Sequence, residues 1–385
     1  MITKRILFCA TVDFHFRAFH LPYLKWLKEQ GWEVHIAASG KLDLPYVDKK
    51  YDIPIQRSPL HKANLSAYKQ LKEIIHKNQY KIIHCHTPMG GVLTRLAAKR
   101  VRKNGTKVIY TAHGFHFCKG VPFTNWLIYY PIEKVLSNYT DTLITINKED
   151  YKLALNHHFK AKNIEHVHGV GVNIEKFHPV NAIQKNQLRK QYGYKDDEFL
   201  MFYAAEFNKN KNQQLLIRSL ELVKAQVPNV KLLLAGEGPL LRECQELTAQ
   251  LGLDKMIDFL GYRNDIDSLL KMCDCAVGSS IREGLPVNIM EAMACGLPVV
   301  ATDNRGHREL VLDQKNGWVI ANQNVLEFAG RLVSLAQNRE LGVELGLNSR
   351  NIILATYGVQ QVLGEKSTIY LNYMNEMEGV LWTAH

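Results

Sequence analysis

Two glutamates, Glu283 and Glu291, stand eight residues apart in the segment 279–292. The segment follows an apolar run and leads into a helix-like stretch, so a loop carries the first carboxylate and a helix the second. A carboxylate can accept two hydrogen bonds side by side, which suits the vicinal diol of a ribose or a sugar. The amides of the helix N-terminus suit an anion such as phosphate. The spacing fits equally well a favourable charge at a helix start and a surface glutamate.

The elements that must position these carboxylates follow an alternating pattern of short apolar runs and helix-like stretches. This pattern is typical of βα units with a parallel sheet. The strands expected in the first half are 6–12, 33–38, 81–84, 107–111 and 142–146, with a helix over 17–30. The strands expected in the second half are 199–205, 230–235, 256–260, 275–278 and 299–301. The helices expected there are 212–226, 239–251, 266–272 and 286–294. Ligands of open parallel sheets lie beyond the carboxyl ends of the strands, where Glu283 stands.

The pattern restarts after residue 195, which predicts two domains, 1–180 and 190–365, and a C-terminal helical segment, 366–385, that packs back on the first domain. Residues 1–180 carry 27 Lys and Arg against 13 Asp and Glu, a net charge of +14, whereas the remainder has a net charge of −3. A basic half suits nucleic acid, an anionic membrane or a phosphorylated ligand, and charge alone fits all three.

Composition excludes several classes of protein. Hydrophobic residues are 46% and charged residues 22% of the chain, which is ordinary for a globular enzyme. No window approaches the ~18 apolar residues of a spanning helix, and the apolar run 6–12 is too short for a secretory signal. Seven cysteines without a CxxC pair predict reduced, buried thiols in a cytosolic protein.

Glu283 and Glu291 match the E-x7-E motif of the retaining glycosyltransferases of family 4, and the sequence resembles this family over nearly its whole length. Further segments that resemble family motifs are 169–179, 235–239 and 259–263. The resemblance implies a GT-B fold, an α/β architecture of two Rossmann-like, doubly wound parallel-sheet domains that face each other across a cleft. The sequence is most similar in appearance to the transferases of bacterial capsule and exopolysaccharide assembly.

The resemblance also implies roles for single residues. Glu291 would hold the ribose hydroxyls of a nucleotide, Glu283 would hold hydroxyls of the donor sugar, and Arg263 would border the base. His113, which follows a strand of the first domain, would contact the donor sugar across the cleft, although a lone histidine is more often structural. The backbone that approaches the sugar and the distal phosphate would come from Gly284, Leu285, Pro286 and Val287.

The phosphate-binding segment departs from the family pattern. Lys211 matches the family lysine and could neutralise the leaving diphosphate. Glu206 stands where relatives carry arginine, and its charge is wrong for that task. Lys209 or Arg282 could compensate. Because of this departure, the sequence also fits a protein that binds a nucleotide sugar but has no transferase activity.

The first strand-to-helix loop lacks the paired glycines of relatives. Asp13 could act on the incoming acceptor hydroxyl, but an N-cap of the following helix is the preferred interpretation. Arg17 and His20, together with Phe16, would suit a phosphorylated or lipid-bearing acceptor. The alternative is an ordinary helix that buries its apolar side and leaves Arg17 in solvent.

Two patterns that suggest metals are better explained otherwise. Asp265-Ile266-Asp267 resembles a DxD site but opens a helix, where capping is expected. His84-Cys85-His86 places two histidines at a strand end without a second pair of ligands. We therefore expect neither a metal nor a cofactor, and the nucleotide sugar would be a substrate.

The resemblance implies a retaining hexosyltransferase that moves a sugar from a nucleotide-diphosphate sugar, most plausibly a UDP-sugar, to a hydroxyl of a lipid-linked or oligosaccharide acceptor in surface polysaccharide biosynthesis. The basic stretch 93–103 and the stretch 123–136, rich in Trp, Tyr and Ile, favour contact with an anionic membrane that displays a polyprenyl-diphosphate acceptor. The alternative for 123–136 is a buried helix. The expected location is the cytoplasm, peripheral on the inner face of the cell membrane.

Competing functions share parts of this pattern. A GT-B epimerase or hydrolase would use the same nucleotide site without an acceptor. A Rossmann oxidoreductase would need a glycine fingerprint that the segment around Gly236 and Gly238 lacks. Nucleic acid is not an expected partner, because no recognition motif or aromatic platform is visible.

Overall fold

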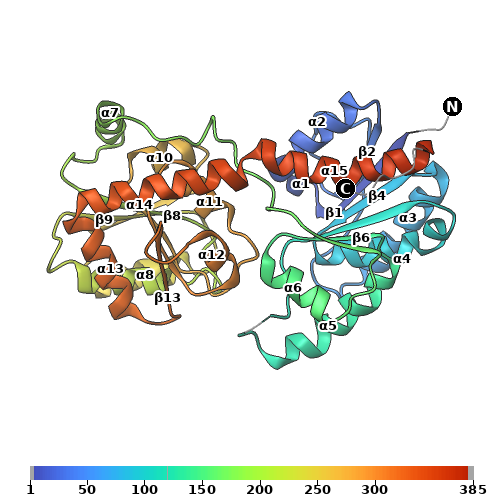
Figure 1. Ribbon diagram of the computed structural model, residues 1–385. Helices are drawn as coiled ribbons and strands as arrows, with labels where there is room; N and C mark the ends of the chain where they lie inside the picture. Colours follow the sequence, from blue (N-terminus) through green and yellow to red (C-terminus); the bar gives the residue numbers. More distant parts are fainter. Residues whose placement is uncertain (1–3, 119, 380–385) are drawn as a thin grey trace. The chain divides into compact units, whose positions relative to one another are not determined.

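The computed structural model describes residues 4–118 and 120–379, which divide into two compact units. The first unit runs to Val170 and also includes the chain from Val362 onward, and the second unit is Gly171–Gln361. Each unit is a parallel sheet with helices on both faces (Figure 1). The predicted α/β class with two doubly wound sheets is therefore confirmed. The last six residues of the predicted segment 366–385 lie outside the described residues.

The first unit contains a seven-stranded parallel sheet with the order β3-β2-β1-β4-β5-β6-β7. Its strands are β1 (Arg5–Val12), β2 (Glu33–Ser39), β3 (Lys49–Asp52), β4 (Ile82–His86), β5 (Lys107–Ala112), β6 (Thr142–Thr145) and β7 (Asn163–His166). Its helices are α1 (Phe14–Phe19), α2 (Leu21–Glu29), α3 (Ala63–Asn78), α4 (Pro88–Lys103), α5 (Phe123–Leu136), the short η1 (Ser137–Tyr139) and α6 (Lys148–Asn156).

Alternate residues of the central strands enter two different cores, because successive side chains of a strand point to opposite faces. Leu7 and Cys9 of β1 pack with α3 and α4, whereas Ile6 and Phe8 pack with α2 and α15 (Val359–Glu378). Both faces of the sheet are buried, which explains why these strands are continuous apolar runs in the sequence.

Helix α15 begins in the second unit and completes the core of the first. Tyr370, Tyr373 and Met374 lie in the same core as Leu24 and Leu27 of α2, and Figure 1 shows α15 beside α1 and α2. The Tyr370 hydroxyl lies 2.5 Å from Nδ1 of His84 on β4. Helix α15 is thereby bonded to a central strand of the sheet.

The second unit contains a six-stranded parallel sheet with the order β10-β9-β8-β11-β12-β13. Its strands are β8 (Phe199–Ala204), β9 (Val230–Ala235), β10 (Ile257–Gly261), β11 (Cys275–Gly278), β12 (Val299–Thr302) and β13 (Gly317–Ile320). Its helices are α7 (Ala182–Tyr192), α8 (Gln213–Val223), α9 (Leu241–Gln250), α10 (Ile266–Met272), α11 (Val287–Ala294), α12 (Arg305–Leu310), α13 (Val325–Gln337), α14 (Arg339–Ile352) and the π-helical turn η2 (Ile353–Tyr357).

One local prediction differs from the structure. The single helix predicted over 17–30 is two helices, α1 and α2, that meet at His20, and Pro22 lies in the first turn of the second. The seven cysteines are buried thiols, in line with the expectation of reduced cysteines. Within residues 4–118 and 120–379, no helix combines the length and apolar character needed to cross a bilayer.

Candidate active site

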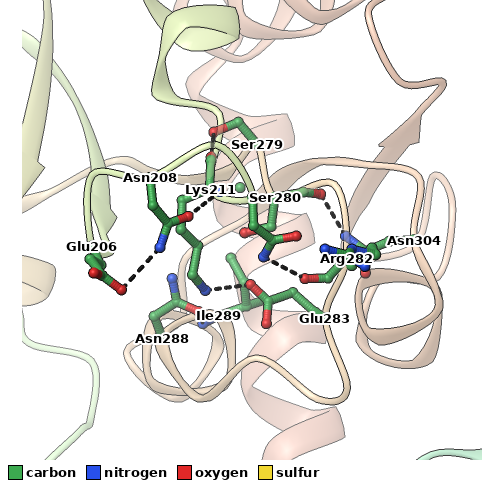
Figure 2. Close-up of polar contacts among 12 residues, drawn as sticks. Glu206, Asn208, Lys211, Ser279, Ser280, Arg282, Glu283, Asn288, Ile289 and Asn304 are labelled. Carbon is green, nitrogen blue, oxygen red and sulfur yellow. Dashed lines mark hydrogen bonds and ion pairs between the residues drawn. The ribbon is translucent and has the colours of Figure 1, made fainter. Parts of the chain in front are cut away.

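Three neighbouring strands of the second unit, β8, β11 and β12, send their carboxyl-terminal loops to one edge of the sheet. These loops are residues 205–212, 279–286 and 303–304. The amide of Ile281 donates to the carbonyl of Asn210 at 2.8 Å, so the first two loops are joined through their backbones. Figure 2 shows the side chains that these loops bring together.

Lys211 and Glu283 form an ion pair at this edge. The Lys211 Nζ lies 2.5 Å from Oε1 of Glu283, and the two side chains point toward one another in Figure 2. Their side chains are only 23% and 15% exposed, so water screens the pair weakly. The Ser279 hydroxyl donates to the Lys211 carbonyl at 2.7 Å and fixes the lysine backbone. The site thus contains a cation and a carboxylate that are paired with each other.

The loop that carries Glu283 is braced by β12 and α12. The Thr302 hydroxyl and the Asn304 amide donate to the Ser280 carbonyl at 2.7 and 2.8 Å. A Cβ on Gly306 would lie 2.7 Å from Cβ of Glu283, so α12 can approach this closely only with glycine there. The segment 304–309 resembles the family loop beyond this strand, but nothing in the sequence indicated that Thr302, Asn304 and Gly306 brace the loop of Glu283.

Glu291 lies in the second turn of α11 and is partly buried, not a surface residue. Burial raises the pKa of its carboxyl to about 7, an effect that Lys176 partly opposes. No hydrogen bond to its carboxyl is recorded within the described residues. A partly dehydrated carboxyl without a partner is a suitable acceptor for hydroxyl groups of a ligand.

The N-terminus of α11 is open to an anion. Pro286 precedes the helix in an extended conformation and makes no side-chain cap, while the Asn288 side-chain oxygen accepts from the Ile289 amide at 2.9 Å. The Asn288 side chain donates to the Ala204 carbonyl at 2.9 Å, which ties this turn to the end of β8. The backbone of Gly284, Leu285 and Val287 therefore surrounds the electropositive start of α11.

The structure does not supply the missing arginine of the phosphate-binding segment. Glu206 is exposed and its carboxylate accepts only a 3.0 Å bond from the amide of Asn208, as far as the described residues show. Lys209 and Arg282, the two predicted substitutes, have exposed side chains. Lys211, on the Glu283 carboxylate, and Arg305, whose Nε donates to the Glu283 carbonyl at 3.1 Å, are cations that the fold holds beside Glu283.

Arg263 follows β10 and is held by a carboxylate. Its Nε donates to Oδ1 of Asp265 at 2.8 Å, and the Tyr192 hydroxyl donates to Oδ2 of the same residue at 2.7 Å. Asp265 makes no side-chain cap on α10, so the capping predicted for it is wrong. Its carboxylate orients Arg263 instead.

The predicted acceptor-side residues lie at the carboxyl end of β1 in the first unit. The N-cap predicted for Asp13 is wrong, because its side chain makes no cap bond and accepts from the Leu42 amide at 2.8 Å and from Lys50 Nζ at 2.6 Å. Burial opposes ionisation of Asp13, but these bonds outweigh it and lower its pKa. A carboxylate engaged in this way is poorly placed to act as a base. Arg17 is exposed, whereas His20 is buried.

His113 follows β5 and lies among other histidines. Its Nε2 is 3.3 Å from Nδ1 of His86, and burial lowers its pKa well below the usual value. The ring is therefore neutral near pH 7. Sequence reasoning treated His113 as a single residue, and nothing in the spacing indicated its histidine neighbours.

Sequence and structure comparisons agree with this geometry. Residues 184–352 match the family described as glycosyl transferases group 1, and residues 5–147 match the family described as glycosyl transferase 4-like. EpsD of Bacillus subtilis (strain 168), itself named as a glycosyltransferase without a stated substrate, is 50% identical over 374 residues, which cover 97% of this chain and 98% of that protein.

A more distant relative carries a defined activity in its name. It is the UDP-Gal:alpha-D-GlcNAc-diphosphoundecaprenol alpha-1,3-galactosyltransferase of Escherichia coli, 28% identical over 81% of this chain and 79% of its own.

Among solved structures, Anabaena Alr3699/HepE in complex with UDP is similar in fold. The TM-score is 0.79 at 19% identity, and the match covers 96% of this chain and all of the other. The two parallel sheets, the loops at their carboxyl ends and the matched families lead to one conclusion: the chain belongs to the glycosyltransferases of group 1, which are related to family 4 and adopt the GT-B fold.

Proposed function

We propose that this protein transfers a sugar from a nucleotide-diphosphate sugar, with uridine diphosphate as the carrier, to a hydroxyl of a lipid-linked or oligosaccharide acceptor. The transfer retains the configuration at the anomeric carbon and serves surface polysaccharide biosynthesis. The observation that carries the proposal is the group of Lys211, Glu283 and Glu291 around the start of α11.

Binding of the donor would rearrange the Lys211–Glu283 ion pair. An incoming diphosphate competes with Glu283 for the Lys211 ammonium, because phosphate oxygens bind a cation as well as a carboxylate does. Glu283 is then released to accept hydrogen bonds from the donor sugar. Glu291 accepts from the two ribose hydroxyls, and Arg263 borders the base. His113 of the first unit acts on the donor sugar, as the family resemblance implies.

The chemistry follows from where charge develops. When the bond between the anomeric carbon and the phosphate oxygen breaks, the diphosphate gains negative charge, which Lys211 and the α11 N-terminus stabilise. The acceptor hydroxyl attacks the same face from which the diphosphate leaves, and its proton passes to a leaving phosphate oxygen. We assign no covalent nucleophile and no metal to this step.

Similarity to a relative supports the choice of substrates. The E. coli relative is named for UDP-galactose and for an acceptor that carries diphosphoundecaprenol. A soluble donor and a membrane-bound acceptor of this kind would require the enzyme to work at a membrane surface.

Helix α5 has the surface that such a location needs. Its exposed apolar residues recur at helical spacing and form one stripe. They are Phe123, Leu127, Ile128, Ile132 and Val135. On the neighbouring α4, Lys99, Arg100 and Lys103 are exposed, whereas Arg95 forms a buried 2.9 Å ion pair with Glu133 of α5. An apolar stripe beside basic residues fits an anionic bilayer surface. The alternative of a buried helix is wrong for this side of α5.

One observation favours a second function, nucleotide-sugar binding without transfer. The exposed carboxylate of Glu206 stands where the family pattern has an arginine. The negative charge of the leaving diphosphate would therefore be stabilised by Lys211 without that arginine. This candidate predicts donor binding and no product.

Calorimetric titration of the protein with UDP, GDP and NAD in EDTA tests the site. Selective binding of UDP is expected, and Glu291→Ala should weaken it, whereas Glu344→Ala, which removes an exposed glutamate of α14, should not. Incubation with UDP-sugars and a polyprenyl-diphosphate-linked sugar then tests transfer. Binding without product would favour the second function, and binding of NAD alone would contradict both.

A further inference from the structure

Four histidines of the first unit place their rings in one cluster: His15, His20, His86 and His113. One ring nitrogen of each lies within 4.8 Å of the corresponding nitrogens of the other three. Imidazole nitrogens are ligands for divalent transition metals, and four of them form a complete donor set for Zn²⁺.

The sheet explains why residues so far apart in sequence meet here. His15 lies in α1, directly after β1, and His20 lies at the junction of α1 and α2. His86 is the last residue of β4, and His113 follows β5. Strands β1, β4 and β5 are consecutive in the sheet and parallel, so their carboxyl ends adjoin. The reason for expecting no metal at 84–86, the lack of further ligands, therefore does not hold for His86.

The distances fit a tetrahedral centre that is slightly expanded. Four nitrogens at about 2.0–2.1 Å from Zn²⁺ lie about 3.3 Å from one another. Nε2 of His15 and Nε2 of His20 are 3.0 Å apart, and Nδ1 of His86 and Nε2 of His113 are 3.3 Å apart. Since no ligand nitrogen is more than 4.8 Å from another, contraction by about 1.5 Å at most would close the set around an ion.

The cluster contains a polar atom that the protein leaves unsatisfied. His86 is fully buried, and its Nε2 has no hydrogen-bond partner among the described residues. Burying such a group without a partner costs free energy. Because one imidazole offers a single nitrogen to one ion, and Nδ1 is the nitrogen that faces His113, this Nε2 is not counted among the four ligand atoms. His84, by contrast, uses both ring nitrogens, on the hydroxyls of Tyr370 and Thr111, and so does not belong to the set.

One charge nearby opposes a cation. Lys366 of α15 is buried, with its Nζ 4.3 Å from the centre of the Tyr23 ring, and its charge is felt by His15, His20 and His113. Because burial lowers the pKa of Lys366 to about 7, a bound metal would compete with protonation of this amine and not with a permanent charge. The affinity should therefore rise when the charge is removed, which an adventitious surface site would not show.

We propose that His15, His20, His86 and His113 bind one divalent transition-metal ion, Zn²⁺ before others, at the carboxyl edge of the sheet of the first unit. The ion is not part of the transfer chemistry. Because it would occupy His113, it would oppose any action of that residue on a sugar. The site stands whether or not the proposed transferase activity is correct.

The test uses the untagged full-length chain, stripped with EDTA and then freed of chelator. Titration with Co²⁺ should give the intense visible absorption of a tetrahedral complex at one equivalent, and Zn²⁺ should abolish it. His15→Ala and His113→Ala should each weaken binding by roughly 100-fold or more, since each removes a direct ligand. His76→Ala, which removes an exposed histidine of α3, should change nothing, and Lys366→Met should tighten binding.

Melting temperatures in EDTA establish that each variant is folded. If His15→Ala alone is unstable, His113→Ala carries the test. The proposal is overturned if the stripped chain binds no Zn²⁺ at micromolar concentrations, or if folded His15→Ala and His113→Ala bind as the unaltered chain does.

Discussion

Lys211 and Glu283 lie 72 residues apart in sequence, yet their Nζ and Oε1 atoms are 2.5 Å apart. The pair exists because β8 and β11 are neighbours in the sheet and each ends in one of the two loops. Lys211 without its partner would be a partly buried, uncompensated charge, as would Glu283. Under the proposed function, a diphosphate would take the place of Glu283 beside Lys211.

Glu283→Ala should harm turnover more than nucleotide binding. If Glu283 contacts the donor sugar, its loss should lower kcat by about 100-fold or more while the Kd for UDP changes little, because UDP lacks the sugar. Steady-state kinetics with a UDP-sugar and calorimetry with UDP measure the two effects. Unchanged kinetics in both Glu283→Ala and Glu291→Ala would refute the assignment of the site.

Glu291 should make donor binding depend on pH. Burial raises its pKa to about 7, so its ionised fraction grows between about pH 6 and pH 8. Affinity for a UDP-sugar, whose diphosphate does not titrate in this range, should rise over the same interval. Glu291→Gln should bind more weakly and with a flat profile. A flat profile in the unaltered protein would contradict the role of this carboxyl.

The same shift predicts an effect on stability. The folded-state pKa of Glu291 lies above the ordinary value of 4.5, so the folded protein binds this proton more tightly than the unfolded chain does. The contribution of Glu291 to stability must fall as pH rises from about 4.5 through about 7. Glu291→Gln should reduce that fall in chemical denaturation, and an identical pH dependence in both proteins would contradict the shift.

Gly306→Ala should reduce activity through the position of Glu283. The added Cβ would lie 2.7 Å from Cβ of Glu283 and 2.9 Å from Cδ of Pro286, so the catalytic loop must move. Gly330→Ala is a matched control, since this helical glycine of α13 has open space around its Cβ position. The control should be stabilised by up to about 1 kcal/mol with normal kcat. Equal activity of the two variants would show that α12 does not fix the loop.

Chelation should leave transfer intact, since the proposal gives the leaving-group charge to Lys211 and the α11 N-terminus. Rates in EDTA should not fall below those without it, and should rise where a metal had occupied His113, while Lys211→Met should lower kcat strongly in both conditions. A rate that falls in EDTA and returns with Mg²⁺ would place a metal in the reaction.

Leu127→Ser with Ile128→Ser should weaken binding to anionic vesicles. Both side chains are exposed on α5, so their replacement removes apolar contact with lipid without disturbing the core. Leu326→Ser on α13 removes a leucine that is 76% exposed in the second unit and serves as the control. Co-sedimentation at low and high salt measures the effect, and equal binding to neutral and anionic vesicles would argue against the basic contribution of α4.

The central strands and the segment from Glu283 to Glu291 were predictable because strands buried on both faces are continuous apolar runs and the site follows one of them. The edge strands β3 and β7 were not predictable. Each is four residues long and only partly buried, and its polar side chains lack the apolar pattern on which the prediction depends.

Contacts between residues that are distant in sequence were not predictable either. Asp13 has the spacing of an N-cap, and only the fold brings Lys50 to it. His20 fits a continuous helix, and the break between α1 and α2 turns it inward, where it meets His15 and His86. Residue types and local spacing carry no information on such contacts, which depend on the order of strands in the sheet.

Helix α15 has a consequence for how the chain folds during its synthesis. The first 170 residues form most of the first unit, but Val362, Tyr370, Tyr373 and Met374 complete its core from the far end of the chain. The second unit is continuous in sequence, so it can fold as soon as its residues have been synthesised. The first unit keeps one apolar face of its sheet uncovered until α15 has been synthesised. Premature termination before residue 362 would therefore damage the half of the protein that was made first.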